Sequence, residues 1–217
     1  MKDNEQPVLI VIAGPNGSGK STITEDLEQE PDFPSLYINA DEIKKNEGIS
    51  DIEAWKKADA QREDALNKRE SFAFETVFSH PSKVELMSYA KELGYDIKLY
   101  FVCTQDADVN VARVKRRYQN GGHDVPEDKI RSRYVRSMEI LKQSLPIADE
   151  AAIFNNSWKN PELIAQKTRD GEIHVCSLQD KDPRSIWTKE KIEELVGLRE
   201  SQSLTEQMRK RNSGNER

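Results

Sequence analysis

The chain has 217 residues, of which 35% are hydrophobic and 33% charged, and its formal net charge is −6. This length favours one domain, and the acidic balance argues against a nucleic-acid binder or a protein that coats anionic membranes. No apolar stretch approaches the roughly 20 residues that a membrane span requires. Residues 1–7 do not have the pattern of a signal peptide, and the two cysteines fit a reduced compartment. We therefore expect a soluble, monomeric, cytoplasmic protein.

Short apolar runs alternate with longer amphipathic stretches along the chain. In chain order, the pattern predicts a strand at 8–13, a helix at 20–30, a strand at 36–39, a helix at 52–68 and a strand at 72–78. A helix ending at Gly94 follows, then a strand at 97–103, a helix at 109–118 and a helical face over 130–145. A last core strand is predicted at 151–154, with a further strand at 171–178 and a helix at 188–198.

Strands that alternate with helices form parallel sheets with right-handed crossovers. The sequence therefore predicts a three-layer α/β fold with a mainly parallel central sheet. We expect a single domain over residues 1–200, and a polar, disordered tail over residues 201–217.

Residues 14–21, the phosphate loop, read Gly-Pro-Asn-Gly-Ser-Gly-Lys-Ser and follow a buried strand. In such a loop, backbone N–H groups converge on phosphates at a helix N-terminus, the lysine reaches the β- and γ-phosphates and the serine hydroxyl binds Mg²⁺. The alternative, a glycine-rich turn that binds nothing, does not account for the complete motif between a strand and a helix. The sequence thus predicts ATP binding by Gly14, Asn16, Gly17, Ser18, Gly19, Lys20, Ser21 and Thr22, with Ser21 as the Mg²⁺ ligand.

Two acidic residues near strand ends favour a kinase over a switch or motor ATPase. Asp41 follows the second strand, where its carboxylate could accept a proton from an attacking hydroxyl or, alternatively, cap the next helix. Glu75 lies in an aromatic run, and a buried acid needs a partner, so we expect it to contact substrate or the Mg²⁺ shell. Hydrolytic switches carry a Mg²⁺-binding acid at a second strand end, and the candidate here, Asp106, is expected to cap a helix instead.

A basic segment, residues 113–136, is expected to form a helical lid. It carries eight bases against three acids, a net charge of +5 (8 − 3), on two helical stretches around Gly121-Gly122-His123. Positive charge around the transferring group supplies most of the rate in phosphoryl transfer, so several of these arginines should face ATP. The alternative, a solvated face with salt bridges, explains the lysines and one or two arginines. Spacings of four and three residues pair Arg113 with Arg117, and Arg133 with Arg136, on shared helix faces.

Histidine and tryptophan residues are assigned smaller roles. We expect His123, beside two glycines, to close the lid through a hydrogen bond and not to act as an acid or base. His80 and His174 are isolated and are assigned no role. Three tryptophans are expected to pack in the core and not to bind ligands: Trp55, Trp158 and Trp187.

Together these segments resemble the zeta-toxin family of P-loop kinases, the toxin halves of bacterial toxin–antitoxin pairs. The resemblance covers residues 7–160. The most specific match is Gly-Gly-His-Asp-Val-Pro at 121–126, followed by Arg-Ser-Arg-Tyr at 131–134. The other matches are residues 14–22, Asn39-Ala40-Asp41, Phe74-Glu75-Thr76 and Asn155-Asn156-Ser157.

The resemblance implies an enzyme that uses ATP and Mg²⁺ to phosphorylate a sugar hydroxyl of UDP-N-acetylglucosamine, with an antitoxin protein as its partner. It implies that Asp41 is the general base and that Lys20, Arg117 and Arg133 stabilise the transferred phosphoryl group. Arg113 would bind the nucleotide, while Glu75, Thr76 and His123 would bind the acceptor. Two alternatives remain open: a P-loop kinase for another acceptor, such as a polynucleotide end or a metabolite, and a nucleotide-binding regulatory ATPase.

Overall fold

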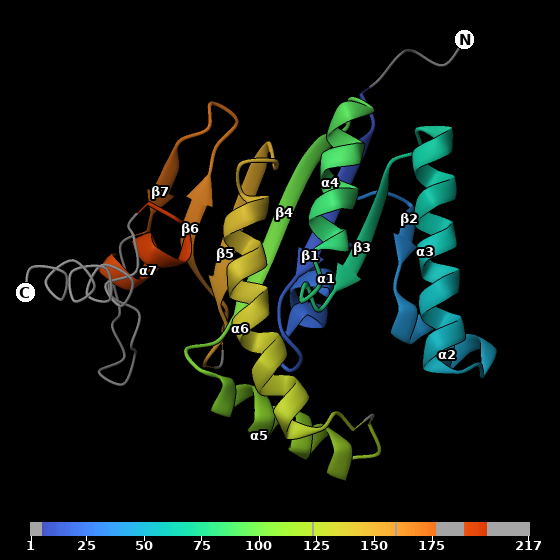
Figure 1. Ribbon diagram of the computed structural model, residues 1–217, viewed down its shortest axis with the longest axis vertical. Helices are drawn as coiled ribbons and strands as arrows, with labels where there is room; N and C mark the ends of the chain where they lie inside the picture. The colour runs from blue at the N-terminus through green and yellow to red at the C-terminus, as the bar shows by residue number, and fades with distance from the viewer. Residues whose placement is uncertain (1–5, 123, 159, 177–188, 199–217) are drawn as a thin grey trace, which may run out of the picture.

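The computed structural model describes residues 6–122, 124–158, 160–176 and 189–198 (Figure 1). Within these residues, seven strands form one sheet in the order β2-β3-β1-β4-β5-β6-β7. Five strands are parallel: β1 (Val8–Ala13), β2 (Leu36–Ile38), β3 (Phe72–Thr76), β4 (Asp96–Cys103) and β5 (Glu150–Asn155). Two strands extend the sheet in antiparallel pairing: β6 (Glu162–Lys167) and β7 (Ile173–Val175). The predicted α/β fold with a mainly parallel sheet is confirmed.

Helices lie on both faces of the sheet, and their bounds are α1 (Lys20–Leu27), α2 (Ala40–Glu47), α3 (Asp51–Lys68), α4 (Ser82–Glu92), α5 (Ala107–Gln119), α6 (Glu127–Ser144) and α7 (Lys189–Leu195). Figure 1 shows α3, α4 and α6 on one face, where with α7 they cover the main core. The other face carries a smaller core that Leu27 of α1 covers. Because side chains alternate across a strand, β1 sends Leu9 and Val11 to one core and Ile10 to the other, which explains its unbroken apolar sequence.

Three details differ from the expected elements. Strand β6 was not predicted, so residues 151–154 are not the last core strand: Ile164 and Ala165 of β6 are fully buried. The first helix ends at Leu27 and not at residue 30. Before Pro31 the backbone forms turns, in which Gln29 and Glu30 donate hydrogen bonds to the carbonyls three residues earlier. A separate helix, α2, precedes α3, whose N-terminus is fixed by a capping box between Ser50 and Glu53.

Some predictions fall on residues that the structure does not describe. Residues 201–217, the predicted tail, lie outside the described residues, as do His123 and Trp187. Among the helices that the structure describes, none combines the length and apolar character needed to cross a membrane.

The carboxyl ends of the parallel strands meet at one edge of the sheet, where α5 and the first part of α6 also lie (Figure 1). The phosphate loop leaves β1 at this edge, between the ends of β3 and β4. Helices α5 and α6 share a small apolar cluster of Val111, Val114 and Ile130. The second half of α6 then continues into the main core through Ile140 and Leu141. The two predicted lid helices are therefore present, and α6 joins the lid directly to the core.

Candidate active site

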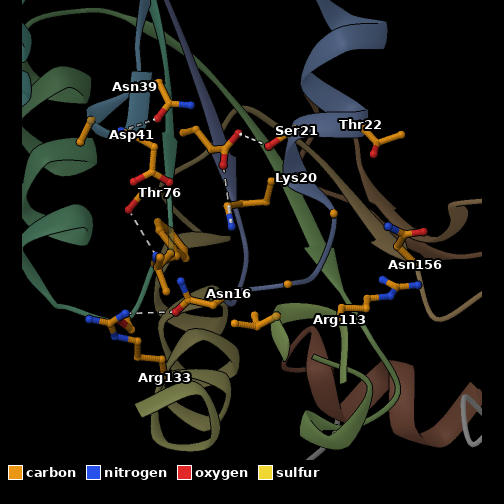
Figure 2. A pocket seen from close by; sticks show the side chains of 18 of the residues that line it. Asn16, Lys20, Ser21, Thr22, Asn39, Asp41, Thr76, Arg113, Arg133 and Asn156 are labelled. Atoms are coloured by element: carbon orange, nitrogen blue, oxygen red, sulfur yellow. Dashed lines mark hydrogen bonds and ion pairs between the residues drawn. The ribbon is translucent and has the colours of Figure 1, made fainter. Parts of the chain in front are cut away.

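One cavity of about 710 Å³ opens at the carboxyl edge of the sheet (Figure 2). The structure brings twelve of the predicted site residues into its wall: Asn16, Gly17, Gly19, Lys20, Ser21, Thr22, Asp41, Glu75, Thr76, Arg113, Arg117 and Arg133. Gly14 and Ser18 are buried behind this wall and shape the phosphate loop from inside. Segments far apart in sequence thus converge on one space, as expected at the strand edge of an open α/β sheet.

Asn156, which follows β5, holds the phosphate loop in place. Its Nδ2 donates a hydrogen bond of 2.8 Å to the carbonyl of Ser18, and the side chain is 7% exposed. Gly19 passes close to this amide with φ of 92°, and a Cβ at Gly19 would lie 2.1 Å from Nδ2. Only glycine fits there. Gly19 also begins α1 without a side-chain cap, so the first amides of the helix can bind an anion.

Lys20 is nearly buried and has few protein partners. Its Nζ donates to the carbonyl of Pro15 at 3.3 Å and lies 3.9 Å from Oε1 of Glu75, and the residue is 8% exposed. Burial lowers the pKa of Lys20, and the nearby carboxylates of Glu75 and Asp41 oppose that shift. A charged amine with one weak hydrogen bond is well placed to receive phosphate oxygens.

Glu75 lies at the end of β3 among hydroxyl groups. Its Oε2 accepts hydrogen bonds of 3.4 Å from Thr24 and from Tyr37, and one of 3.5 Å from Ser21. Burial raises the pKa of Tyr37, and the charge of Glu75 raises it further, so this phenol remains a donor. The partner that a buried acid requires is therefore supplied by hydroxyl groups, and the predicted contact of Glu75 with a substrate stays a prediction.

The oxygen donors around Ser21 fit Mg²⁺. The hydroxyl of Ser21 and a carboxylate oxygen of Glu75 are 3.5 Å apart, and Mg²⁺ prefers such oxygen ligands. The described residues hold no group of three or more His, Cys, Asp and Glu side chains that could bind a metal alone.

Asp41 is not the cap of α2. Asn39 has that role, because its Oδ1 accepts the backbone N–H of Asp41 at 2.9 Å. Asp41 is the second residue of the helix, and its side chain is free of the capping bond. Figure 2 shows the side chains of Asp41 and Thr76 directed into the same part of the cavity. The capping alternative for Asp41 is therefore wrong, and its carboxylate can face a bound acceptor.

Thr76 turns the chain beyond β3. Its hydroxyl accepts the N–H of Phe78 at 3.2 Å, and Phe78 has a φ of 59° although its side chain is fully buried. A left-handed conformation is uncommon for a bulky residue and is often found at functional sites. Residues 76–80 all line the cavity as a result of this turn.

The lid reaches the phosphate loop through Asn16. Arg133 of α6 donates to Oδ1 of Asn16 at 3.1 Å, and Asn110 of α5 donates to its carbonyl at 2.6 Å. Arg113 donates to the carbonyl of Trp158 at 3.4 Å, and burial lowers its pKa. Arg113 and Arg117 both line the cavity, as their spacing predicted.

Other bases of the lid belong to the solvated surface. Lys115 and Arg131 each pair with Glu127 at 2.8 Å, so the salt-bridge alternative is correct for these two residues. Arg136 is exposed and does not line the cavity. Asp106 accepts the N–H of Val109 at 3.0 Å and caps α5, as predicted.

We expect the lid to be more mobile without nucleotide than with it. Gly121 and Gly122 follow the C-terminus of α5, and the arginines that face the cavity repel one another until phosphates bind. Hydrogen exchange of amides within residues 119–127 should therefore slow when an ATP analogue is added. Amides of the core strand β4 provide the internal control. Unchanged exchange in the lid would show a rigid loop.

Five cavity residues were missed or misassigned in the sequence. Trp55 was expected to pack in the core, but it is 51% exposed and lines the cavity. Trp158 also lines it, and so does His80, to which no role was given. Arg62 and Lys83 are two further residues of the cavity wall, and they are 4% and 8% exposed. The seven-residue spacing from Trp55 to Arg62 places both on one face of α3 and was the available signal.

Comparison with known proteins identifies the family of the chain. The zeta toxin family model matches residues 1–176. An uncharacterized protein of Haemophilus influenzae (strain ATCC 51907 / DSM 11121 / KW20 / Rd) is 32% identical over 134 residues, which cover 59% of this chain and 94% of that protein.

Solved structures are similar in fold. One is from the PezAT chromosomal toxin–antitoxin system of Streptococcus pneumoniae, with a TM-score of 0.54 and 17% identity, covering 96% of this chain and 85% of that one. Another is the AvrRxo1-ORF1:-ORF2 complex with ATP, with a TM-score of 0.58 and 19% identity, covering 80% of this chain and 61% of that one. With a family match across most of its length, the chain belongs to the zeta toxin family and is a phosphotransferase.

Proposed function

We propose that the protein is an ATP- and Mg²⁺-dependent kinase that transfers the γ-phosphate to a hydroxyl of a nucleotide sugar such as UDP-N-acetylglucosamine. The observation that carries this proposal is that Asp41 and the phosphate-loop residue Lys20 open into one cavity, together with three lid arginines. A phosphate site, a carboxylate base and positive charge are the parts that phosphoryl transfer requires.

The residues of the site divide the steps of this mechanism among them. The carboxylate of Asp41 accepts the proton of the attacking hydroxyl. Lys20, Arg117 and Arg133 stabilise charge on the transferred group, while Arg113 contacts the nucleotide. Glu75 and Thr76 orient the acceptor, and His123, which the structure does not describe, closes the lid over it. When bound, ATP supplies the phosphoryl group and Mg²⁺, held by Ser21, neutralises its oxygens.

An antitoxin is the proposed protein partner. The similar PezAT structure comes from a toxin–antitoxin system, and this chain belongs to the zeta toxin family. We propose that such a partner inhibits the enzyme, which would then act as a zeta-type toxin.

An acceptor screen tests the proposed reaction. ATP consumption should rise sharply when the right acceptor is added, since transfer and not hydrolysis is the expected activity. Nucleotide sugars should stimulate turnover more than nucleosides or oligonucleotide ends, and the Lys20→Ala variant should show no stimulation. Stimulation by oligonucleotide ends alone would identify a polynucleotide kinase, and equal ATP turnover without any acceptor would favour a regulatory ATPase.

A further inference from the structure

The turn at residues 76–80 forms part of the cavity wall and contains an unfavourable backbone conformation. Phe78 has a φ of 59°, which few bulky residues adopt, and such a conformation persists only where the surrounding contacts enforce it. The hydroxyl of Thr76 accepts the N–H of Phe78 within the turn. The ring of Phe78 is anchored in the main core beside that of Phe101, with the two centroids 6.2 Å apart.

Two other parts of the fold hold the backbone of this turn by hydrogen bonds. The carbonyl of Thr76 accepts the N–H of Gly14, at the start of the phosphate loop, at 3.3 Å. The carbonyl of Val77 accepts the hydroxyl of Ser137, from α6, at 2.7 Å. Val77 lies beyond the last residue of β3, so its carbonyl needs a donor from outside the sheet, and Ser137 supplies it.

Ser137 differs from the other buried serine of α6 in how it uses its hydroxyl. A serine inside a helix commonly donates to the carbonyl four residues earlier. Ser144 does so, with a hydrogen bond of 2.9 Å to the carbonyl of Ile140. Ser137 donates instead to a residue 60 positions away in the chain. Both serines are fully buried, so the difference lies in the partner and not in exposure to solvent.

Helix α6 fixes this turn relative to the phosphate loop. Arg133 precedes Ser137 by four residues and lies on the same helix face, where it donates to Oδ1 of Asn16 at 3.1 Å. One face of α6 therefore contacts both the phosphate loop and the turn. The second half of the helix is held in the main core by Ile140 and Leu141, which makes α6 a fixed support for both contacts.

We propose that Ser137 is a positioning residue for phosphoryl transfer, whose hydroxyl fixes the turn at 76–80 so that an acceptor lying against it presents its hydroxyl to Asp41. The inference rests on the proposed kinase function and adds to it a fully buried residue that acts through the turn. Figure 2 shows Thr76 and Asp41 directed into the same part of the cavity, so a shift of the turn would displace the acceptor from the carboxylate. A misplacement of about 1 Å can lower the rate of such a reaction by roughly 10²-fold.

Ser137→Ala tests this role with UDP-N-acetylglucosamine as the acceptor. We expect kcat for its phosphorylation to fall by roughly 10- to 100-fold. Affinity for a non-hydrolysable ATP analogue should not change, because the phosphate loop keeps its own contacts. The slow hydrolysis of ATP without acceptor should not change either, since water does not need the turn to reach the phosphate. A general loss of structure would lower all three quantities together.

Ser144→Ala is the matched control, because it removes an equally buried hydroxyl from the same helix. Each variant loses one hydrogen bond, so melting temperature should fall by a similar amount in both. Turnover should fall only in Ser137→Ala. Ser137→Cys keeps a weak donor of similar size and should have an intermediate turnover, and it carries the test if Ser137→Ala fails to fold.

Hydrogen exchange measures the hold on the turn without any turnover. Amides of residues 77–80 should exchange faster in Ser137→Ala than in the wild type, and at the wild-type rate in Ser144→Ala. Unchanged exchange in Ser137→Ala, wild-type turnover in that variant, or an equal loss of turnover in both alanine variants would overturn the positioning role. Wild-type protein that phosphorylates no acceptor would instead contradict the proposed kinase, so the two hypotheses fail on different results.

Discussion

Lys20→Ala is expected to reduce phosphoryl transfer by roughly 10³-fold or more while the protein stays folded. The side chain of Lys20 is 8% exposed and lies in the wall of the cavity, and its amine is proposed to stabilise charge on the transferred phosphoryl group. An arginine finger, another cation that stabilises the transferred group, contributes roughly 10³–10⁵-fold to phosphoryl transfer, and we take the lower end of that range for Lys20. The measurement is the rate of acceptor phosphorylation under saturating ATP.

The fold should tolerate this substitution because the amine of Lys20 makes few polar contacts with the protein. The amine donates a hydrogen bond of 3.3 Å to the carbonyl of Pro15 and lies 3.9 Å from Oε1 of Glu75. Glu75 keeps its three hydroxyl donors when the amine is removed. Removing a buried charge also removes its desolvation cost. Melting temperature should therefore change little. Lys68→Ala, on the exposed surface of α3, is the control and should leave both quantities unchanged. Turnover close to the wild-type rate in Lys20→Ala would contradict the assignment of the phosphate loop.

The central strands could be predicted because strands that are buried on both faces have continuous apolar sequences. Strand β1 is covered on both faces and is apolar at every position, and β4 is mostly buried in the same way. Strand β6 offers no such pattern: its sequence is Glu-Leu-Ile-Ala-Gln-Lys, with three apolar residues between polar ones. Its burial comes from pairing with β5 and β7, and this long-range pairing leaves no periodic signal in a six-residue segment.

The site residues also fall into two groups: those that a contiguous motif places in the site, and those that long-range packing brings there. The phosphate loop could be predicted because the strand, turn and helix that form it are contiguous, so the spacing alone determines the geometry. Arg62 and Lys83 could not, because they reach the cavity only through the packing of α3 and α4 against the sheet. In sequence they belong to strongly charged stretches that suggest a solvated face. The prediction for Trp55 was wrong for a different reason: an aromatic residue on a helix usually packs in the core, whereas Trp55 lines the cavity.

Asp41→Asn is expected to lower phosphorylation of the acceptor by roughly 10²–10⁴-fold, the usual contribution of a positioned acid or base. Affinity for ATP should change little, because the phosphate loop and Mg²⁺ account for most of it. Stability should also change little. Oδ1 of Asn39 bonds to the backbone N–H of Asp41, so the helix cap does not depend on the side chain that is replaced.

Glu42→Gln provides the matched control for this variant. Glu42 is the next residue in the first turn of α2, so its substitution removes the same charge from the same helix end, worth about 0.3–1 kcal/mol through the helix dipole. It does not line the cavity, so turnover should stay near the wild-type rate. Measuring nucleotide affinity, melting temperature and turnover on both variants isolates the chemistry of Asp41. Weakened binding of ATP and Mg²⁺ in Asp41→Asn would place this residue in the metal shell, and near-normal turnover would show that the carboxylate is not the base.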